Sequence, residues 1–283
     1  MIRFLALLLL SGLSAAAFPY PPQFKDARAE VYRTVSDTDL KIWIFGESDA
    51  EAPKPGIVFF FGGGWVSGSP TQFERQARHL AERGMIAMVA DYRVKKRNGT
   101  KAVACVEDGK AAVAWIRKNA ARLGVDPKRI AAAGGSAGGH VAASTGTLSG
   151  FGSDERPNAM VLFNPGLTFA ELGKWKPKGF GVTNTAEAAK QRLGVDDPKE
   201  LSPSHHVGPH TPPTLILHGD KDTTVPLASA QVFEAQMKKA GRPCKVVIYE
   251  GEKHAFFNRG KAFTQTLEDM DAFLVDLGWI EKR

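Results

Sequence analysis

Cysteine is scarce in this chain. Its 283 residues include only two, Cys105 and Cys244, so a scaffold held together by several disulfides is excluded. A single bridge between these two is not expected either. The strand pattern places them near strands that are far apart in a sheet, beyond disulfide reach. We expect two buried thiols.

Several binding signatures are also missing. Gly134 and Gly139 have the glycine spacing of a phosphate-binding loop, but His140 stands where the lysine belongs, and no serine or threonine follows it. No G-x-G-x-x-G fingerprint of dinucleotide binding occurs, and no H-E-x-x-H or His/Cys spacing marks a metal site. The sequence therefore indicates no metal and no organic cofactor.

The charge balance is basic, with a formal net charge of +7. No basic cluster alternates with aromatic residues, as a nucleic-acid surface would require, so no nucleic-acid partner is expected. The densest basic run, residues 95–97, is expected to be a solvated loop. A diffuse positive field can still attract acidic polymers or a membrane surface.

The first seventeen residues have the pattern of a secretory signal peptide. A short basic start precedes the apolar run Phe4–Leu13, and the small residues Ser14–Ala17 follow it. The run is too short to span a bilayer. No cysteine lies near Ala17, so lipid attachment is not indicated. We predict a signal peptide over 1–17 and a periplasmic or secreted mature protein over 18–283, without stable membrane insertion after cleavage. An uncleaved anchor or a buried first helix is the alternative.

Beyond this leader, strand and helix patterns alternate along the chain. The predicted strands cover 30–34, 40–45, 56–61, 85–90, 130–133, 159–163, 214–218 and 245–249. The predicted helices cover 73–83, 106–122, 140–145, 228–240 and 265–277. Such alternation predicts an α/β fold with a mostly parallel central sheet and helices on both faces. Residues 166–201 break the rhythm and include a short helical piece over 185–193, so we interpret them as a small cap insertion.

The segment Gly134–Gly138 is a G-x-S-x-G pentapeptide centred on Ser136, between a short apolar run and a helical pattern. A serine on such a sharp strand-to-helix turn points its hydroxyl clear of the sheet, and the flanking glycines prevent clashes. The alternative is an ordinary glycine-rich turn. The context favours a nucleophile, with the backbone N–H of Ala137 at the helix start as a donor to a developing negative charge.

A serine nucleophile needs a histidine base and a carboxylate to orient that base. Among seven histidines, His254 lies in a short loop after the last predicted strand, at the sheet edge where such sites form. The loop after the preceding strand offers Asp220 and Asp222. Asp222 is favoured because it lies further into the loop, whereas Asp220 is placed to buttress the turn. The other histidines are assigned to helices, a strand end and a proline-rich loop, namely 79, 140, 205, 206, 210 and 218.

The order Ser136, Asp222, His254 is the one expected on an α/β-hydrolase sheet. In this arrangement His254 takes the serine proton during attack and returns it to the leaving alcohol, while Asp222 fixes its tautomer. The glycine run 62–64 follows the first long buried strand, where an oxyanion loop is expected. A structural tight turn is the alternative for these glycines.

With these motifs in family order, residues 30–280 resemble the α/β-hydrolase superfamily, and within it the bacterial acetyl esterase/lipase branch related to hormone-sensitive lipase. The segments that carry the resemblance are 61–65, 91–93, 134–138, 217–226 and His254. The resemblance implies that Gly63, Gly64 and Ala137 are the oxyanion donors. Two departures stand out: Phe61 replaces the usual histidine before the glycines, and few residues precede the first predicted strand, so we expect no long N-terminal cap of the kind typical of that group.

The resemblance implies an exported serine esterase that forms an acyl-enzyme on carboxylic esters, with short-chain acyl, acetyl or feruloyl esters of carbohydrates as substrates. Trp65, Trp175 and Phe180 are candidate pocket residues, although aromatic side chains are more often core packing. A serine peptidase of prolyl-oligopeptidase-like type, or a non-catalytic binding module on the same fold, is the alternative. The sequence leaves the acyl group, the alcohol and the oligomeric state open.

Overall fold

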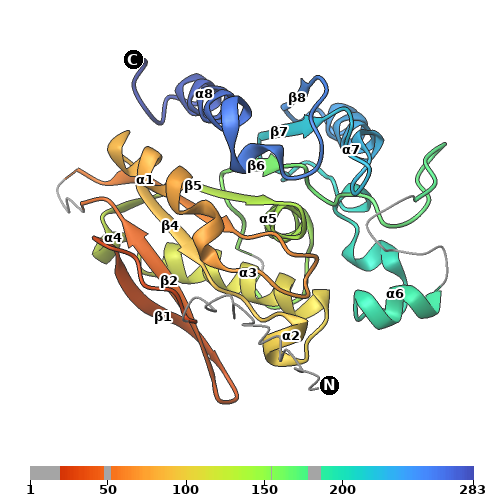
Figure 1. The fold of residues 1–283 in the computed structure, drawn as a ribbon, viewed down its shortest axis with the longest axis horizontal. Helices are drawn as coiled ribbons and strands as arrows, with labels where there is room; N and C mark the ends of the chain where they lie inside the picture. The colour runs from red at the N-terminus through yellow and green to blue at the C-terminus, as the bar shows by residue number, and fades with distance from the viewer. Residues whose placement is uncertain (1–19, 48–51, 154, 178–185) are drawn as a thin grey trace, which may run out of the picture.

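Eight strands form one sheet in the computed structural model, which describes residues 20–47, 52–153, 155–177 and 186–283 (Figure 1). Their order across the sheet is β1-β2-β4-β3-β5-β6-β7-β8. The strands are β1 (Arg28–Val35), β2 (Thr38–Phe45), β3 (Lys54–Phe60), β4 (Ile86–Ala90), β5 (Val125–Gly135), β6 (Ala159–Phe163), β7 (Thr214–Gly219) and β8 (Cys244–Tyr249).

The sheet is antiparallel at one edge and parallel across the rest. The hairpin β1–β2 pairs antiparallel, and β2 pairs antiparallel with β4. Every further pair, from β4–β3 to β7–β8, is parallel. The predicted α/β-hydrolase fold, with its mostly parallel sheet, is confirmed. The carboxyl ends of β5, β7 and β8 consequently lie along one sheet edge.

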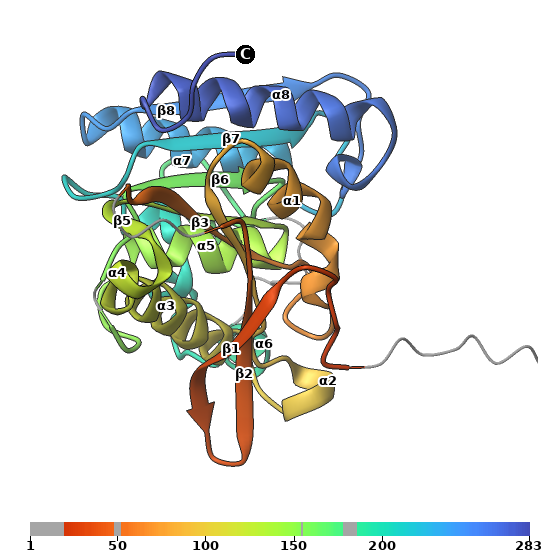
Figure 2. The same cartoon turned by 90° about the vertical axis from the view of Figure 1, so that its left-hand side faces the viewer.

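Helices cover both faces of the sheet (Figures 1 and 2). One face packs α1 (Glu74–Glu82) and α8 (Gly260–Asp276), and the other packs α3 (Ala102–Lys118), α5 (Ala137–Thr147) and α7 (Leu227–Lys239). The shorter helices are α2 (Lys95–Asn98), α4 (Ala120–Leu123) and α6 (Ala186–Arg192). Four 3₁₀ turns join them, η1 (Pro70–Phe73), η2 (Pro198–Leu201), η3 (Pro203–His205) and η4 (Phe256–Asn258).

Successive side chains of each strand point to opposite faces of the sheet, so the core forms two layers, one on each face. In β3, Val58 and Phe60 pack against the face of α3 and α5, whereas Ile57 and Phe59 pack against the face of α1 and α8. All four are buried, which explains why this strand reads as a continuous apolar run. Each such side chain contributes about 1.5–3 kcal/mol by leaving water. None of the helices in the described ranges is long and apolar enough to cross a bilayer.

The structure corrects some expected boundaries. The run 95–97 is not a solvated loop but most of α2, where Gly99 closes the turn with φ +67°. The helix expected over 106–122 begins one turn earlier, and it breaks at Asn119 into α3 and α4. The two cysteines are free, with Cys105 buried and Cys244 partly buried.

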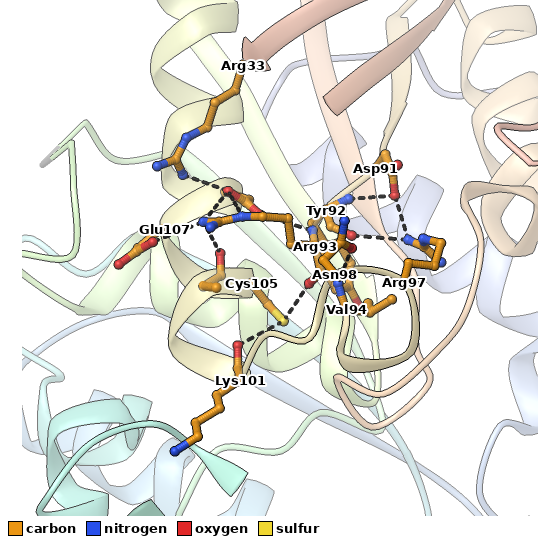
Figure 3. Close-up of polar contacts among 12 residues, drawn as sticks. Arg33, Asp91, Tyr92, Arg93, Val94, Arg97, Asn98, Lys101, Cys105 and Glu107 are labelled. Atoms are coloured by element: carbon orange, nitrogen blue, oxygen red, sulfur yellow. Dashed lines mark hydrogen bonds and ion pairs between the residues drawn. The ribbon is translucent and has the colours of Figure 1, made fainter. Parts of the chain in front are cut away.

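A buried ionic network holds the segment between β4 and α3 (Figure 3). Arg33 and Arg93 both bind the carboxylate of Asp108, with N–O distances of 2.6 and 2.9 Å, and that carboxylate is fully buried. Arg97 pairs with Asp91 at 2.9 Å. Removing one partner of a buried pair typically costs about 3–5 kcal/mol, so this network fixes the loop that α2 belongs to.

His140 is buried in α5 and acts as a neutral hydrogen-bonding side chain. Trp65 Nε1 donates to its Nδ1 at 3.2 Å, so Nε2 carries the proton and donates to the carbonyl of Leu201 at 2.8 Å. Burial lowers the pKa of His140 to about 4, and the hydrogen bond to Leu201 only partly offsets this.

Replacing His140 by glutamine should reduce the loss of folding stability at low pH. The folded protein keeps this imidazole neutral down to about pH 4, whereas the unfolded chain takes up the proton near pH 6.5. The wild type therefore loses up to about 3 kcal/mol through this group as the pH falls between those values. Urea unfolding at both pH values measures the loss, with the exposed His210→Gln as control. An equally large loss in His140→Gln would contradict this role.

Candidate active site

Ser136 lies on the sharp turn that joins β5 to α5. Its backbone has φ +55° and ψ −117°, a conformation that non-glycine residues rarely adopt. A Cβ on Gly138 would lie 2.0 Å from the carbonyl oxygen of Phe60, and one on Gly134 would lie 2.4 Å from the oxygen of Gly138. Only glycine fits at both positions, so the pentapeptide is a steric requirement of this turn.

His254 lies in the loop after β8 and faces Ser136. Its Nε2 is 2.9 Å from Ser136 Oγ, and its Nδ1 is 2.7 Å from Asp222 Oδ2. The next residue fixes the loop, because the backbone N–H of Ala255 donates to Asn164 Oδ1 at 3.0 Å. The structure thus brings together the three residues that the sequence analysis selected, from the ends of β5, β7 and β8.

Asp222 is fully buried, and donors surround it on both oxygens. Oδ1 accepts from the backbone N–H groups of Thr224 and Val225, at 2.9 and 2.8 Å. Oδ2 faces His254 and lies 3.5 Å from His218 Nε2. Burial would raise the pKa of Asp222, but the hydrogen bonds from His218, His254 and Val225 outweigh it and hold the pKa well below its ordinary value. The carboxylate therefore stays ionised.

Two neighbouring polar residues make their shortest hydrogen bonds to other groups. Asp220 accepts from the backbone N–H of Gly251 at 2.7 Å, which is the buttressing contact expected of it. His218 donates through Nε2 to the carbonyl of Val225 at 2.8 Å. The structure therefore places Asp222, and not Asp220, against the imidazole.

The glycine loop after β3 approaches the serine from the other side. The N–H of Gly62 is already used, because it donates to Gln72 Oε1 at 2.6 Å. Gly63 has φ +131°, and a Cβ there would lie 2.1 Å from the oxygen of Ser67. Ala137 is the first residue of α5, where backbone N–H groups have no acceptor within the helix. These positions suit Gly63, Gly64 and Ala137 as donors to an oxyanion.

Phe61, which stands in place of the expected histidine, has a packing role. Its ring stacks on Tyr92 with 4.0 Å between centroids, and the Tyr92 hydroxyl donates to the Phe61 carbonyl. The glycine loop is thus anchored at its first residue by an aromatic pair and a buried hydrogen bond.

A cavity of about 440 Å³ opens at this site. Its lining consists of the serine, the histidine, the glycine loop and several residues from neighbouring loops, namely Gly62, Gly63, Gly64, Gln72, Ser136, Arg192, Thr223, Thr224, His254, Ala255 and Phe257. Sequence reasoning missed Gln72, Arg192 and Phe257, because nothing in their local pattern marks them. Arg192 comes from α6, within the segment that was interpreted as a cap.

The aromatic residues suggested for the pocket lie elsewhere. Trp65 is buried and lines a neighbouring cavity rather than the one at Ser136. Trp175 pairs with Leu172 in an isolated bridge and is absent from the linings of both cavities. Phe180 lies outside the described residues.

Two histidines of the proline-rich loop, His205 and His206, bond to protein atoms. His205 contacts Ser202 Oγ at 2.8 Å and the carbonyl of Glu171 at 3.1 Å, and His206 contacts the carbonyl of Lys199 at 2.8 Å. Burial lowers the pKa of His205. In the described part of the chain, no three side chains of the metal-binding types come together.

Comparison with known proteins identifies the family. A family model described as alpha/beta hydrolase fold matches residues 57–258. The chain is 25% identical over 269 residues to a probable isoprenylcysteine alpha-carbonyl methylesterase of Oryza sativa subsp. japonica, covering 88% of this chain and 63% of that protein. It is 30% identical over 234 residues to an acetylxylan esterase of Xylanibacter ruminicola, covering 80% and 45%.

Among solved structures, a thermophilic esterase of Thermogutta terrifontis with propionate bound has 43% identity and a TM-score of 0.85, covering 94% of this chain and all of that one. The same esterase is also known phosphonylated by sarin. The chain spans 54–63% of the length of the first curated relatives it matches. Since the family model covers more than half of the sequence, the chain belongs to the α/β-hydrolase superfamily, among its hormone-sensitive-lipase-like esterases and lipases.

Proposed function

We propose that the protein hydrolyses carboxylic esters through an acyl-enzyme formed on Ser136. The observation that carries this proposal is the continuous chain of hydrogen bonds from Ser136 through His254 to Asp222, beside an open cavity. The esterases among its relatives support the same reaction class. An ionised carboxylate behind the imidazole keeps Nδ1 protonated and leaves Nε2 free to accept a proton.

In this proposal each group has one role. Ser136 Oγ attacks the ester carbonyl carbon while its proton passes to His254 Nε2. The carbonyl oxygen becomes an oxyanion and accepts hydrogen bonds from the N–H groups of Gly63, Gly64 and Ala137. Collapse of the intermediate expels the alcohol, which takes the proton from His254. Water then repeats the cycle on the acyl-serine, releasing the acid and restoring the serine.

We propose short-chain acyl esters as substrates, with acetyl or feruloyl esters of carbohydrates as the natural class. The similar acetylxylan esterase and the propionate-bound esterase support this choice. Gln72, Thr223 and Thr224 give the cavity a polar wall that suits a hydroxyl-rich alcohol. Export through the predicted leader, which lies outside the described residues, would give access to such polymers. Rates on acetylated xylan, feruloylated sugars and p-nitrophenyl esters of increasing length test the assignment, and a preference for long acyl chains would contradict it.

Replacing Ser136 by alanine removes the nucleophile and should lower the turnover of p-nitrophenyl acetate by a factor of about 10³ or more. The variant should also resist a fluorophosphonate probe, while the exposed Ser149→Ala is labelled like the wild type. Unchanged turnover in Ser136→Ala would refute the assignment. A wild type that resists the probe would indicate a binding module, and cleavage of peptide amides in preference to esters would indicate a peptidase.

Replacing Asp222 by asparagine should lower kcat by about 10⁴-fold, because the amide no longer favours the imidazole tautomer with its proton on Nδ1. Asp220→Asn is the matched control two residues away. Its side-chain oxygen still accepts from Gly251, so kcat should stay within a few-fold of the wild type. Steady-state kinetics on p-nitrophenyl acetate distinguish the two. Equal losses in both variants would contradict the role of Asp222.

A further inference from the structure

A second cavity, of about 530 Å³, lies beside the one at Ser136. The two share Gly64 and Arg192 in their linings. The rest of the second lining comes from the glycine loop, the segment around α2 and helix α6, namely Trp65, Val66, Lys95, Gly99, Thr100, Lys101, Ala188 and Gln191. The two cavities therefore adjoin at Gly64 and Arg192.

The second cavity is positively charged. Lys95, Lys101 and Arg192 line it, and among the described residues no aspartate or glutamate lines either cavity. Lys101 is engaged, since its Nζ donates to the carbonyl of Lys190 at 2.9 Å. In the described ranges no carboxylate pairs with Lys95 or Arg192, and the sequence of 178–185 contains no acidic residue.

Two buried polar atoms in this lining have no hydrogen-bond partner among the described residues. They are Arg192 Nε and Thr100 Oγ1. Burial lowers the pKa of Arg192, and no neighbouring carboxylate compensates for it. Holding a partly desolvated guanidinium without an anion costs free energy. A ligand that supplies the missing acceptor would recover that cost.

Arg192 also lies directly against the proposed oxyanion loop. A Cβ on Gly64 would be 3.3 Å from Arg192 Nη2, and the guanidinium carbon lies 5.5 Å from the centre of the Trp65 ring. The opposite wall is tied to the same loop, because the backbone N–H of Lys95 donates to the Trp65 carbonyl at 3.0 Å. The partly buried pair Arg97–Asp91 in Figure 3 holds that wall in place.

We propose that the second cavity is a subsite for a carboxylate carried by the ester substrate, bound by Arg192 and Lys95 with Thr100 as a further donor. The proposal rests on the ester hydrolysis proposed above and names its substrate class: esters with a free carboxylate several bonds from the scissile carbonyl. A guanidinium presents a planar fork that matches a carboxylate, and the lysine adds a second positive charge. Trp65 and Val66 supply an apolar wall for the atoms between the two groups.

Two pairs of esters test the subsite. In the first pair, monoethyl glutarate carries a free carboxylate on the acyl side and ethyl butyrate is its neutral counterpart. In the second pair, the anion of 4-acetoxybenzoic acid carries the carboxylate on the alcohol side and methyl 4-acetoxybenzoate is its neutral counterpart. The rate of proton release at constant pH gives kcat/KM for each ester. Each value is then divided by the rate constant for hydrolysis of the same ester by hydroxide. The wild type should prefer the anionic member of at least one pair, and Arg192→Gln should lower that preference by about tenfold or more.

Matched variants separate the subsite from the overall charge of the protein. Lys95→Gln should lower the same preference, mainly through KM, and Arg192→Lys should retain part of it. The exposed Lys239→Gln removes one positive charge from α7, which contributes no lining residue to either cavity, and should keep the wild-type preference. Thermal unfolding followed by circular dichroism checks that each variant is folded.

Distinct results would overturn the subsite and the underlying reaction. If the neutral esters are hydrolysed but neither anionic ester is preferred, the subsite is wrong and the ester hydrolysis stands. A preference that survives in both Arg192→Gln and Lys95→Gln also overturns the subsite. If the wild type hydrolyses none of the four esters, the proposed function fails and the subsite fails with it.

Discussion

The close contact between the β5–α5 turn and the end of β3 is the constraint on which the site depends. A side chain on Gly138 would collide with the carbonyl oxygens of Phe60 and Phe61, at 2.0 and 2.3 Å. Because the turn sits directly on this strand end, the glycine loop that continues from β3 must lie beside the serine. A Cβ on Gly62 would be only 3.3 Å from Ser136 Cβ. One packing contact thus places the nucleophile next to its oxyanion donors.

Around this contact, buried charges fall into two classes. Asp108 and Asp222 are buried but satisfied, the first by two arginines and the second by imidazoles and backbone N–H groups. These groups fix loop positions and a protonation state. Arg192 is different, because its partly buried guanidinium has no anionic partner in the described ranges. A charge held by its neighbours maintains the fold, whereas one without a partner points to a ligand.

Much of this arrangement was predictable from local sequence. The strand runs and the order of Ser136, Asp222 and His254 follow from hydrophobic pattern and chain order alone, since parallel strands bring their carboxyl ends to one edge. The pocket walls were not predictable. Trp65, a candidate pocket residue, packs against His140 and lines the second cavity rather than the one at Ser136, and nothing in the local sequence marks Arg192 as a pocket residue. Tertiary contacts decide such positions, because side chains distant in sequence meet only in the folded molecule.

The proposed reaction requires that Ser136 is acylated during turnover. Mixing the protein with p-nitrophenyl propionate, quenching with acid in the first turnovers and measuring the intact and peptide masses tests this directly. The account predicts one propionyl group on the peptide that contains Ser136, formed at the rate of the initial p-nitrophenol burst and lost on longer incubation. Ester hydrolysis with no acyl group on that serine, or with the group on another residue, would contradict it.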